Sequence, residues 1–142
     1  MLKNYYLFAL LLGLLLPACH SAQTAAAPAP AAAPVPSFVQ WDKKFVELGG
    51  VKKGEKRSLF YEFTNTFKES IQIDIVDACD CTKVEFPRGV IEPGQKGRLD
   101  VVFDSTEKEA AETISINIIF KNTHADGAPY IETVTYGFEL LK

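Results

Sequence analysis

The 142-residue chain has little of what metal centres and hydrolytic active sites are built from, with two histidines, three cysteines and one methionine. His20 and His124 lie far apart, which excludes a helical motif with two neighbouring imidazoles. The serines are scattered, and no serine or cysteine nucleophile is next to His124 in the sequence. We therefore expect no enzyme active site and no cofactor.

A basic excess is also missing, because 15 Lys and Arg stand against 18 Asp and Glu and the formal net charge is −3. Binding to phosphate backbones depends on clustered basic side chains. The charge balance therefore predicts no nucleic acid among the partners.

No hydrophobic run is long enough to cross a membrane as a helix. The run Tyr5–Leu16 has 12 residues, whereas a bilayer core of about 30 Å needs roughly 20 residues. It follows Lys3 near the start of the chain. This arrangement is typical of the hydrophobic part of a secretory signal peptide.

The residues Leu16-Pro17-Ala18-Cys19 resemble a bacterial lipobox, in which a small residue precedes the cysteine that becomes lipidated. The resemblance implies that residues 1–18 are a lipoprotein signal peptide and that Cys19 carries diacylglycerol and palmitate-type acyl chains. Two or more such chains hold a protein on a membrane without spanning it. The alternative is an ordinary secretory signal with a cysteine beside its cleavage site by chance.

Alanine and proline dominate the segment that follows Cys19, with prolines at 28, 30, 34 and 36. Such a segment cannot bury a core and favours extended polyproline II geometry, so its 18 residues could reach roughly 56 Å. We expect residues 19–37 to be a tether. No acidic residue follows Cys19 directly, which by the sorting rules of bacterial lipoproteins favours an outer membrane, with the protein facing the periplasm.

The remainder, residues 38–142, alternates between apolar and polar side chains and lacks a convincing helical period. In one run, Ile71, Ile73 and Ile75 are expected to share a face. Turn residues such as Glu92-Pro93-Gly94 separate the runs. About seven short strands without room for crossover helices predict an all-β fold, an immunoglobulin-like antiparallel β-sandwich. The expected strands cover residues 45–48, 58–64, 71–76, 83–86, 98–103, 114–120 and 134–140.

Cys79 and Cys81 interrupt this pattern with one residue between them. On a regular strand their Cα atoms would be about 6.6 Å apart, the upper limit for a disulfide, and a bulge or turn would bring them closer. The two cysteines could be buried thiols, a disulfide that closes a tiny ring, or two thiolates for a soft metal. Thiol-redox motifs usually have two residues between their cysteines, so catalysis has weaker support.

Several of these motifs resemble, in order and spacing, the DUF1573 family of bacterial extracytoplasmic proteins. The resemblance covers residues 38–142 and implies an immunoglobulin-like fold related to the major sperm protein and ASH domains. No catalytic residues come with it. The matching motifs are Phe63-Thr-Asn65, Cys79-Asp-Cys81-Thr82, Phe86-Pro87, Ile91-Glu-Pro93-Gly94 and Leu99 to Asp104.

The sequence as a whole predicts a lipoprotein of the bacterial cell envelope, anchored at Cys19. Its domain is expected to act by protein interaction or as a structural module, with an unidentified envelope protein as partner. Sandwich domains offer loops and sheet edges for such contacts. The alternative function is thiol-redox chemistry or soft-metal binding, of copper or zinc, at Cys79-Asp80-Cys81.

Overall fold

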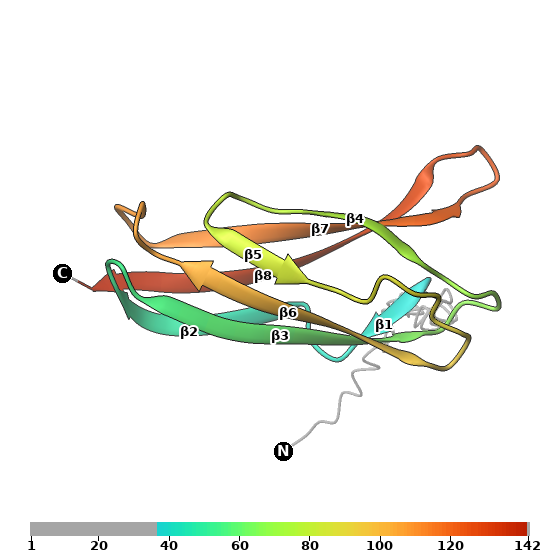
Figure 1. The fold of residues 1–142 in the computed structure, drawn as a ribbon, viewed down its shortest axis with the longest axis horizontal. Coiled ribbons are helices and arrows are strands. Elements are labelled where there is room, and N and C mark those ends of the chain that lie inside the picture. Colours follow the sequence, from blue (N-terminus) through green and yellow to red (C-terminus); the bar gives the residue numbers. More distant parts are fainter. Residues whose placement is uncertain (1–36, 142) are drawn as a thin grey trace, which may run out of the picture. The chain divides into compact units, whose positions relative to one another are not determined.

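Every regular element of residues 37–141, the part of the chain that the computed structural model describes, is a β-strand (Figure 1). The predicted signal peptide, Cys19 and the tether up to residue 36 lie outside the described residues. Within 37–141 no helix is long and apolar enough to cross a membrane. The strands are β1 (Val39–Trp41), β2 (Phe45–Lys52), β3 (Lys56–Asn65), β4 (Ile73–Asp77), β5 (Thr82–Glu85), β6 (Lys96–Asp104), β7 (Glu112–Thr123) and β8 (Pro129–Leu141).

The eight strands form two four-stranded sheets, which confirms the predicted all-β sandwich. Sheet 1 has the order β1-β3-β6-β5 and sheet 2 the order β2-β8-β7-β4. All pairs are antiparallel except β2 with β8, which run parallel. Because β2 and β8 are far apart in the sequence, no hairpin connects them and forces them to be antiparallel.

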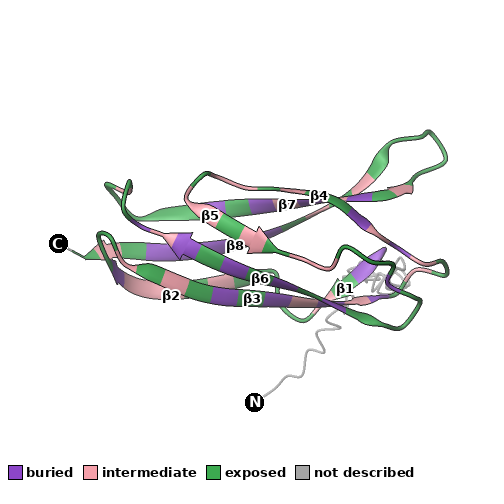
Figure 2. Ribbon diagram, viewed as in Figure 1, coloured by how far each residue is buried: buried purple, intermediate pink, exposed green. Residues whose placement is uncertain are grey.

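The core lies between the sheets and follows the period of two. Along β6, Gly97, Leu99, Val101 and Phe103 are buried, and the residues between them point away from the core. Figure 2 shows this alternation as buried and exposed bands along the strand. The largest fully buried side chains of the core are Tyr61, Tyr136, Phe63, Phe103, Phe120, Ile71, Ile73, Leu99, Ile116, Ile118, Val51 and Val101.

The alternation breaks in β4, where the expectation for Ile75 is wrong. Ile73 is 2% exposed, but Ile75 is 55% exposed. The register of β4 against β7 shifts between these two residues, so a bulge turns Ile75 outward and Val76 toward the core. A bulge adds one residue locally, and simple alternation cannot reveal it.

The strand β1 was not among the predicted strands, because three residues are too few for an alternating pattern. It pairs with the end of β3 and brings Trp41 opposite Phe63. The Trp41 Nε1 donates a hydrogen bond of 3.1 Å to Glu132 Oε2 on β8, so β1 links the two sheets. Lys44 Nζ lies 2.7 Å from the same carboxylate oxygen.

Candidate functional site

One edge of β6 is only half covered by its neighbour β5. β3 pairs with β6 over its whole length, whereas β5 pairs only with Asp100–Phe103. On the β5 side, no strand within residues 37–141 pairs with Lys96–Leu99. This half of β6 is an open sheet edge.

Proline explains why β5 ends where it does. Glu85 is opposite Asp100, so a longer β5 would place Pro87 opposite Arg98. Proline has no backbone N–H, and it cannot donate the hydrogen bond that this position of the ladder needs. The pairing therefore stops after Glu85.

The open edge presents backbone groups in a defined pattern. The Asp104 N–H donates to the Cys81 carbonyl at 2.9 Å, so Asp104 directs its backbone groups toward the β5 side. In an antiparallel ladder every second residue does the same. Lys96 and Arg98 therefore direct their N–H and C=O groups to the open edge.

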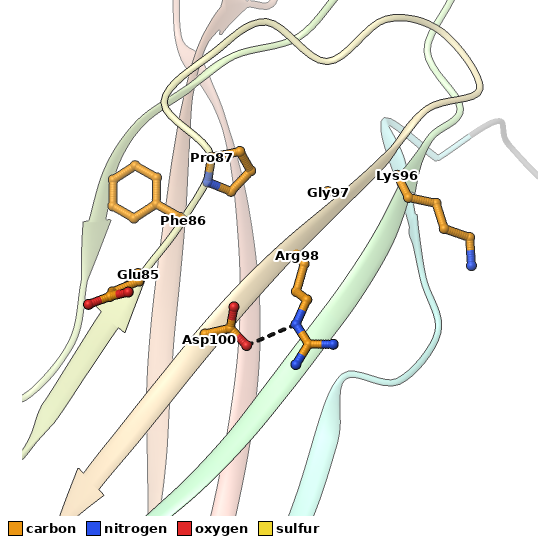
Figure 3. Close-up of a pocket in the computed structure, with 7 residues that line it drawn as sticks. All are labelled: Glu85, Phe86, Pro87, Lys96, Gly97, Arg98 and Asp100. Atoms are coloured by element: carbon orange, nitrogen blue, oxygen red, sulfur yellow. Dashed lines mark hydrogen bonds and ion pairs between the residues drawn. The ribbon is translucent and has the colours of Figure 1, made fainter.

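A hollow of about 380 Å³ lies against this edge. In Figure 3, Phe86 and Pro87 are on one side of it and the β6 residues Lys96, Gly97 and Arg98 on the other. The hollow is lined by Glu85, Phe86, Pro87, Lys96, Gly97, Arg98 and Asp100. It combines an apolar wall with charged side chains and backbone groups of an unpaired strand.

Arg98 is held on the outer face of sheet 1 by several contacts. Its Nε lies 2.8 Å from Asp100 Oδ1, the dashed line in Figure 3. Its guanidinium also lies 3.6 Å from Glu62 Oε1 and 4.0 Å from the ring centroid of Phe60. Exposed ion pairs of this kind contribute little to stability, but together they orient the cation beside the hollow.

The second candidate site is the cysteine pair, which the structure joins as a disulfide. The Cα atoms of Cys79 and Cys81 are 5.2 Å apart, closer than on an extended strand. The reason is a turn, closed by a 2.8 Å hydrogen bond from the Thr82 N–H to the Cys79 carbonyl. Both cysteines are half-buried against the core.

The Thr82 hydroxyl contacts both sulfurs and connects them to the core. Its Oγ1 lies 3.2 Å from Cys79 Sγ, 3.5 Å from Cys81 Sγ and 2.6 Å from the Tyr136 hydroxyl. Burial raises the pKa of Tyr136 above its ordinary value. Tyr136 therefore keeps its proton at neutral pH and can donate it in the hydrogen bond to Thr82.

Cys81 also lines a hollow of about 330 Å³ together with Asp80, Asp104, Thr106 and Glu107. Hydrogen bonds from Thr106 lower the pKa of Asp104 to about 2, so this carboxylate is ionised at neutral pH. Asp104 also pairs with Lys56 Nζ at 3.1 Å, so Asp80 and Glu107 give the hollow its acidic character. Of the two cysteines, Cys81 is the one that lines this hollow.

The residues available for a metal are few. In the part of the chain that the structure describes, no three His, Cys, Asp or Glu side chains are grouped so that they could hold a metal ion. The ring of His124 packs against the ring of Tyr130, with centroids 3.7 Å apart and an angle of 38° between the ring planes.

Sequence reasoning selected Cys79 and Cys81 but missed Tyr136 and the open edge of β6. From the sequence, Tyr136 is one more core residue of the last strand. Its hydroxyl contacts Thr82, which is 54 residues away, and no local pattern reveals this contact. Pro87, by contrast, was a signal that could have located the end of β5 and with it the open edge.

Three solved structures show the same fold at low sequence identity. An ASH/PapD-like domain of human CEP192 has a TM-score of 0.61 and 8% identity, covering 84% of this chain and 96% of that one. A Porphyromonas gingivalis W83 protein of unknown function has a TM-score of 0.59 and 18% identity, and the match covers 72% of this chain and 46% of that one. The Vibrio cholerae protease VesB has a TM-score of 0.58 and 16% identity, and the match covers 72% of this chain and 32% of that one.

The chain thus spans about a third of VesB and about half of the Porphyromonas protein, and the likeness shows the fold alone. No curated protein matches the sequence. The family described as "Protein of unknown function (DUF1573)" matches residues 39–134. This match spans more than half of the chain and confirms the resemblance seen in the motifs, so the chain belongs to the DUF1573 family.

Proposed function

We propose that this domain binds an extended segment of another envelope protein by strand addition at the open edge of β6. The observation that carries the proposal is the unpaired stretch Lys96–Leu99 beside the hollow of Figure 3. An added strand would exchange backbone hydrogen bonds with Lys96 and Arg98, which supplies affinity without a particular sequence. This function is binding and not catalysis, and the protease activity of VesB is not transferred to it.

Side chains around the edge define what the added segment should contain. A residue placed opposite Arg98 points to the same face as the guanidinium, so an acidic side chain fits there. The same hollow offers the apolar surfaces of Phe86 and Pro87 to a neighbouring residue of the segment. We infer a ligand strand that alternates acidic and apolar residues.

Amide hydrogen exchange with peptides selected from a random library tests this binding mode. Full-length protein in detergent should bind selected extended peptides, and binding should slow exchange at the amides of Lys96 and Arg98. Replacing both Lys96 and Arg98 by Glu should weaken binding about tenfold or more, because it reverses the charge beside the acidic positions. Lys83→Glu is the matched control, since Lys83 is exposed on β5 of the same sheet and outside the hollow.

Protection at the edge strand β4 or in the loops, with Lys96 and Arg98 unchanged, would overturn the proposal. So would equal loss of binding in the control variant.

We further propose that lipid on Cys19 anchors the protein to the outer membrane, facing the periplasm, with residues 20–37 as a tether. The lipobox-like sequence supports this placement. Cys19→Ser should abolish palmitate labelling and move the protein from the membrane fraction to the soluble fraction. Retention of this variant in membranes, or a wild-type protein found in the inner-membrane fraction on a density gradient, would contradict the placement.

A further inference from the structure

The Cys79–Cys81 disulfide is poorly suited to stabilising the fold. It closes a loop with a sequence separation of only 2, and the loop-closure contribution of a disulfide grows with loop length. Backbone hydrogen bonds hold the segment independently, from Thr82 N–H to the Cys79 carbonyl and from Asp104 N–H to the Cys81 carbonyl. Opening the disulfide would therefore leave the backbone of this segment in place, while the two sulfurs move apart to non-bonded distance.

The two sulfurs differ in their surroundings. Cys81 lines the acidic hollow, and Cys79 is not among its lining residues. Cys79 Sγ is the closer of the two to the Thr82 hydroxyl, at 3.2 Å against 3.5 Å. A thiol that enters this hollow thus meets Cys81, while Cys79 is closer to the hydroxyl that can donate a hydrogen bond.

The Thr82 hydroxyl is in turn oriented by Tyr136. The sulfurs of a disulfide carry no hydrogen, so in the 3.2 Å contact with Cys79 the donor has to be the Thr82 hydroxyl. Its hydrogen is available for this when the Tyr136 hydroxyl, 2.6 Å away, donates to Thr82 Oγ1. A hydrogen bond to a thiolate stabilises it and improves it as a leaving group. Thr82 and Tyr136 are positioning residues in this arrangement.

We propose that Cys79–Cys81 is a thiol–disulfide exchange site for a partner dithiol flanked by cationic side chains. A partner thiolate attacks Cys81 Sγ, the Cys79–Cys81 bond breaks, and its electron pair leaves on Cys79 Sγ, which the Thr82 hydroxyl stabilises. The second partner thiolate then attacks the partner sulfur of the mixed disulfide and releases Cys81. The partner dithiol is oxidised to a disulfide, the cysteines are reduced, and the two protons of the partner thiols pass through solvent to Cys79 and Cys81.

The acidic rim sets the preferred charge of the partner. Asp80 and Glu107 line the hollow beside Cys81 and repel an anionic thiol, whereas the charge of Asp104 is offset by Lys56 Nζ at 3.1 Å. A neighbouring cation on the attacking molecule reverses this effect. The same arrangement allows the reverse reaction with a partner disulfide.

Small thiols of opposite charge test the site on the full-length protein. At equal thiolate concentration and low salt, cysteamine should reduce the disulfide about tenfold faster than 2-mercaptoethanesulfonate. Mass spectrometry of a quenched reaction should place the first mixed disulfide on Cys81. Glu107→Gln combined with Asp80→Asn should remove most of the charge preference.

The role of Thr82 as a positioning residue is tested by the rate of reduction and by the pKa of the Cys79 thiol. Thr82→Val should slow reduction about tenfold, because it removes the hydrogen bond to the leaving thiolate. In the Cys81→Ser background it should also raise the pKa of the Cys79 thiol, measured by thiolate absorbance, an effect that a purely structural role would not produce. Thr133→Val is the control, because Thr133 is exposed on β8 and bonds only to Asn117.

A disulfide that reacts equally with both thiols, or first at Cys79, would overturn the proposal. A Cys79 pKa unchanged by Thr82→Val would overturn the assigned role of the hydroxyl.

Discussion

Gly97 is a residue whose missing side chain is required by its neighbour. It is buried on β6 opposite Phe63, and the ring of Phe63 occupies the space where a Cβ atom would be. The sequence places Gly97 next to a turn and gives no sign of this contact, because Phe63 belongs to a different strand.

We predict that Gly97→Ala lowers the free energy of unfolding by about 2 kcal/mol, since the added methyl forces the Phe63 ring to shift. Urea denaturation would measure the loss. Gly89→Ala is the matched control, because a Cβ there meets open space, and its effect should stay within about 0.5 kcal/mol. Equal effects of the two substitutions would contradict this account.

Asn65 is the other residue whose role depends on distant partners. Its side chain is 1% exposed. The amide donates to the carbonyls of Glu69 and Ile91 at 3.0 and 2.9 Å, and its oxygen accepts from the Phe67 N–H at 2.9 Å. The family resemblance picked out Asn65, but only the fold shows that it organises the loop after β3.

We predict that Asn65→Ala destabilises the domain by about 2–3 kcal/mol, because buried backbone groups lose their partners. Thermal or urea unfolding measures this loss. Asn117→Ala on β7 removes only a half-exposed amide that accepts from Thr133, and it should cost much less. A mild effect at Asn65 would mean that water replaces its hydrogen bonds.

At the scale of elements, alternation located most strands and failed where the backbone departs from regularity. Six of the predicted runs overlap strands along most of their length, and the run 71–76 overlaps β4, which begins at Ile73. The failures were β1, which is too short to show a pattern, and the bulge in β4. Both reflect pairing with another strand and not local preference.

The bulge predicts different effects for substitutions at Ile73 and Ile75, whereas simple alternation predicts similar ones. Ile73→Ser should destabilise the domain by about 3 kcal/mol or more because Ile73 is buried, whereas exposed Ile75→Ser should change stability by less than about 1 kcal/mol. Chemical denaturation of the two variants would compare the losses in the free energy of unfolding. Similar losses would place Ile75 in the core and remove the bulge.

At the scale of the whole molecule, a few polar contacts join the two sheets across the core. The Tyr61 hydroxyl on β3 donates to the Thr135 carbonyl on β8 at 2.7 Å. Burial, and to a smaller degree the neighbouring Tyr136, raise the pKa of Tyr61 well above its ordinary value of about 10. The folded state therefore holds this proton more tightly than the unfolded chain does.

Because folding raises the pKa of Tyr61, the stability of the domain depends on pH in the alkaline range. The contribution of the Tyr61 hydroxyl to stability is fully present below about pH 10, the pKa of this group in the unfolded chain. It is lost as the pH rises from there through the higher pKa of the folded state. Tyr61→Phe should cost about 1 kcal/mol at neutral pH and should flatten the fall in stability above pH 10. Urea unfolding at pH 7 and above pH 10 would show it, and an equally steep fall in the variant would assign the alkaline loss to other groups.

The amino-acid sequence by itself determined the class of the fold, the face that most side chains present and the closeness of Cys79 to Cys81. These features depend on residues within a few positions of each other, through the period of two and the reach of the backbone. The tertiary structure alone decided the parallel pairing of β2 with β8, the open half of the β6 edge and the contact of Thr82 with Tyr136. Alternation orients a strand toward a core without naming its neighbour, and each of these features arises between strands far apart in the chain.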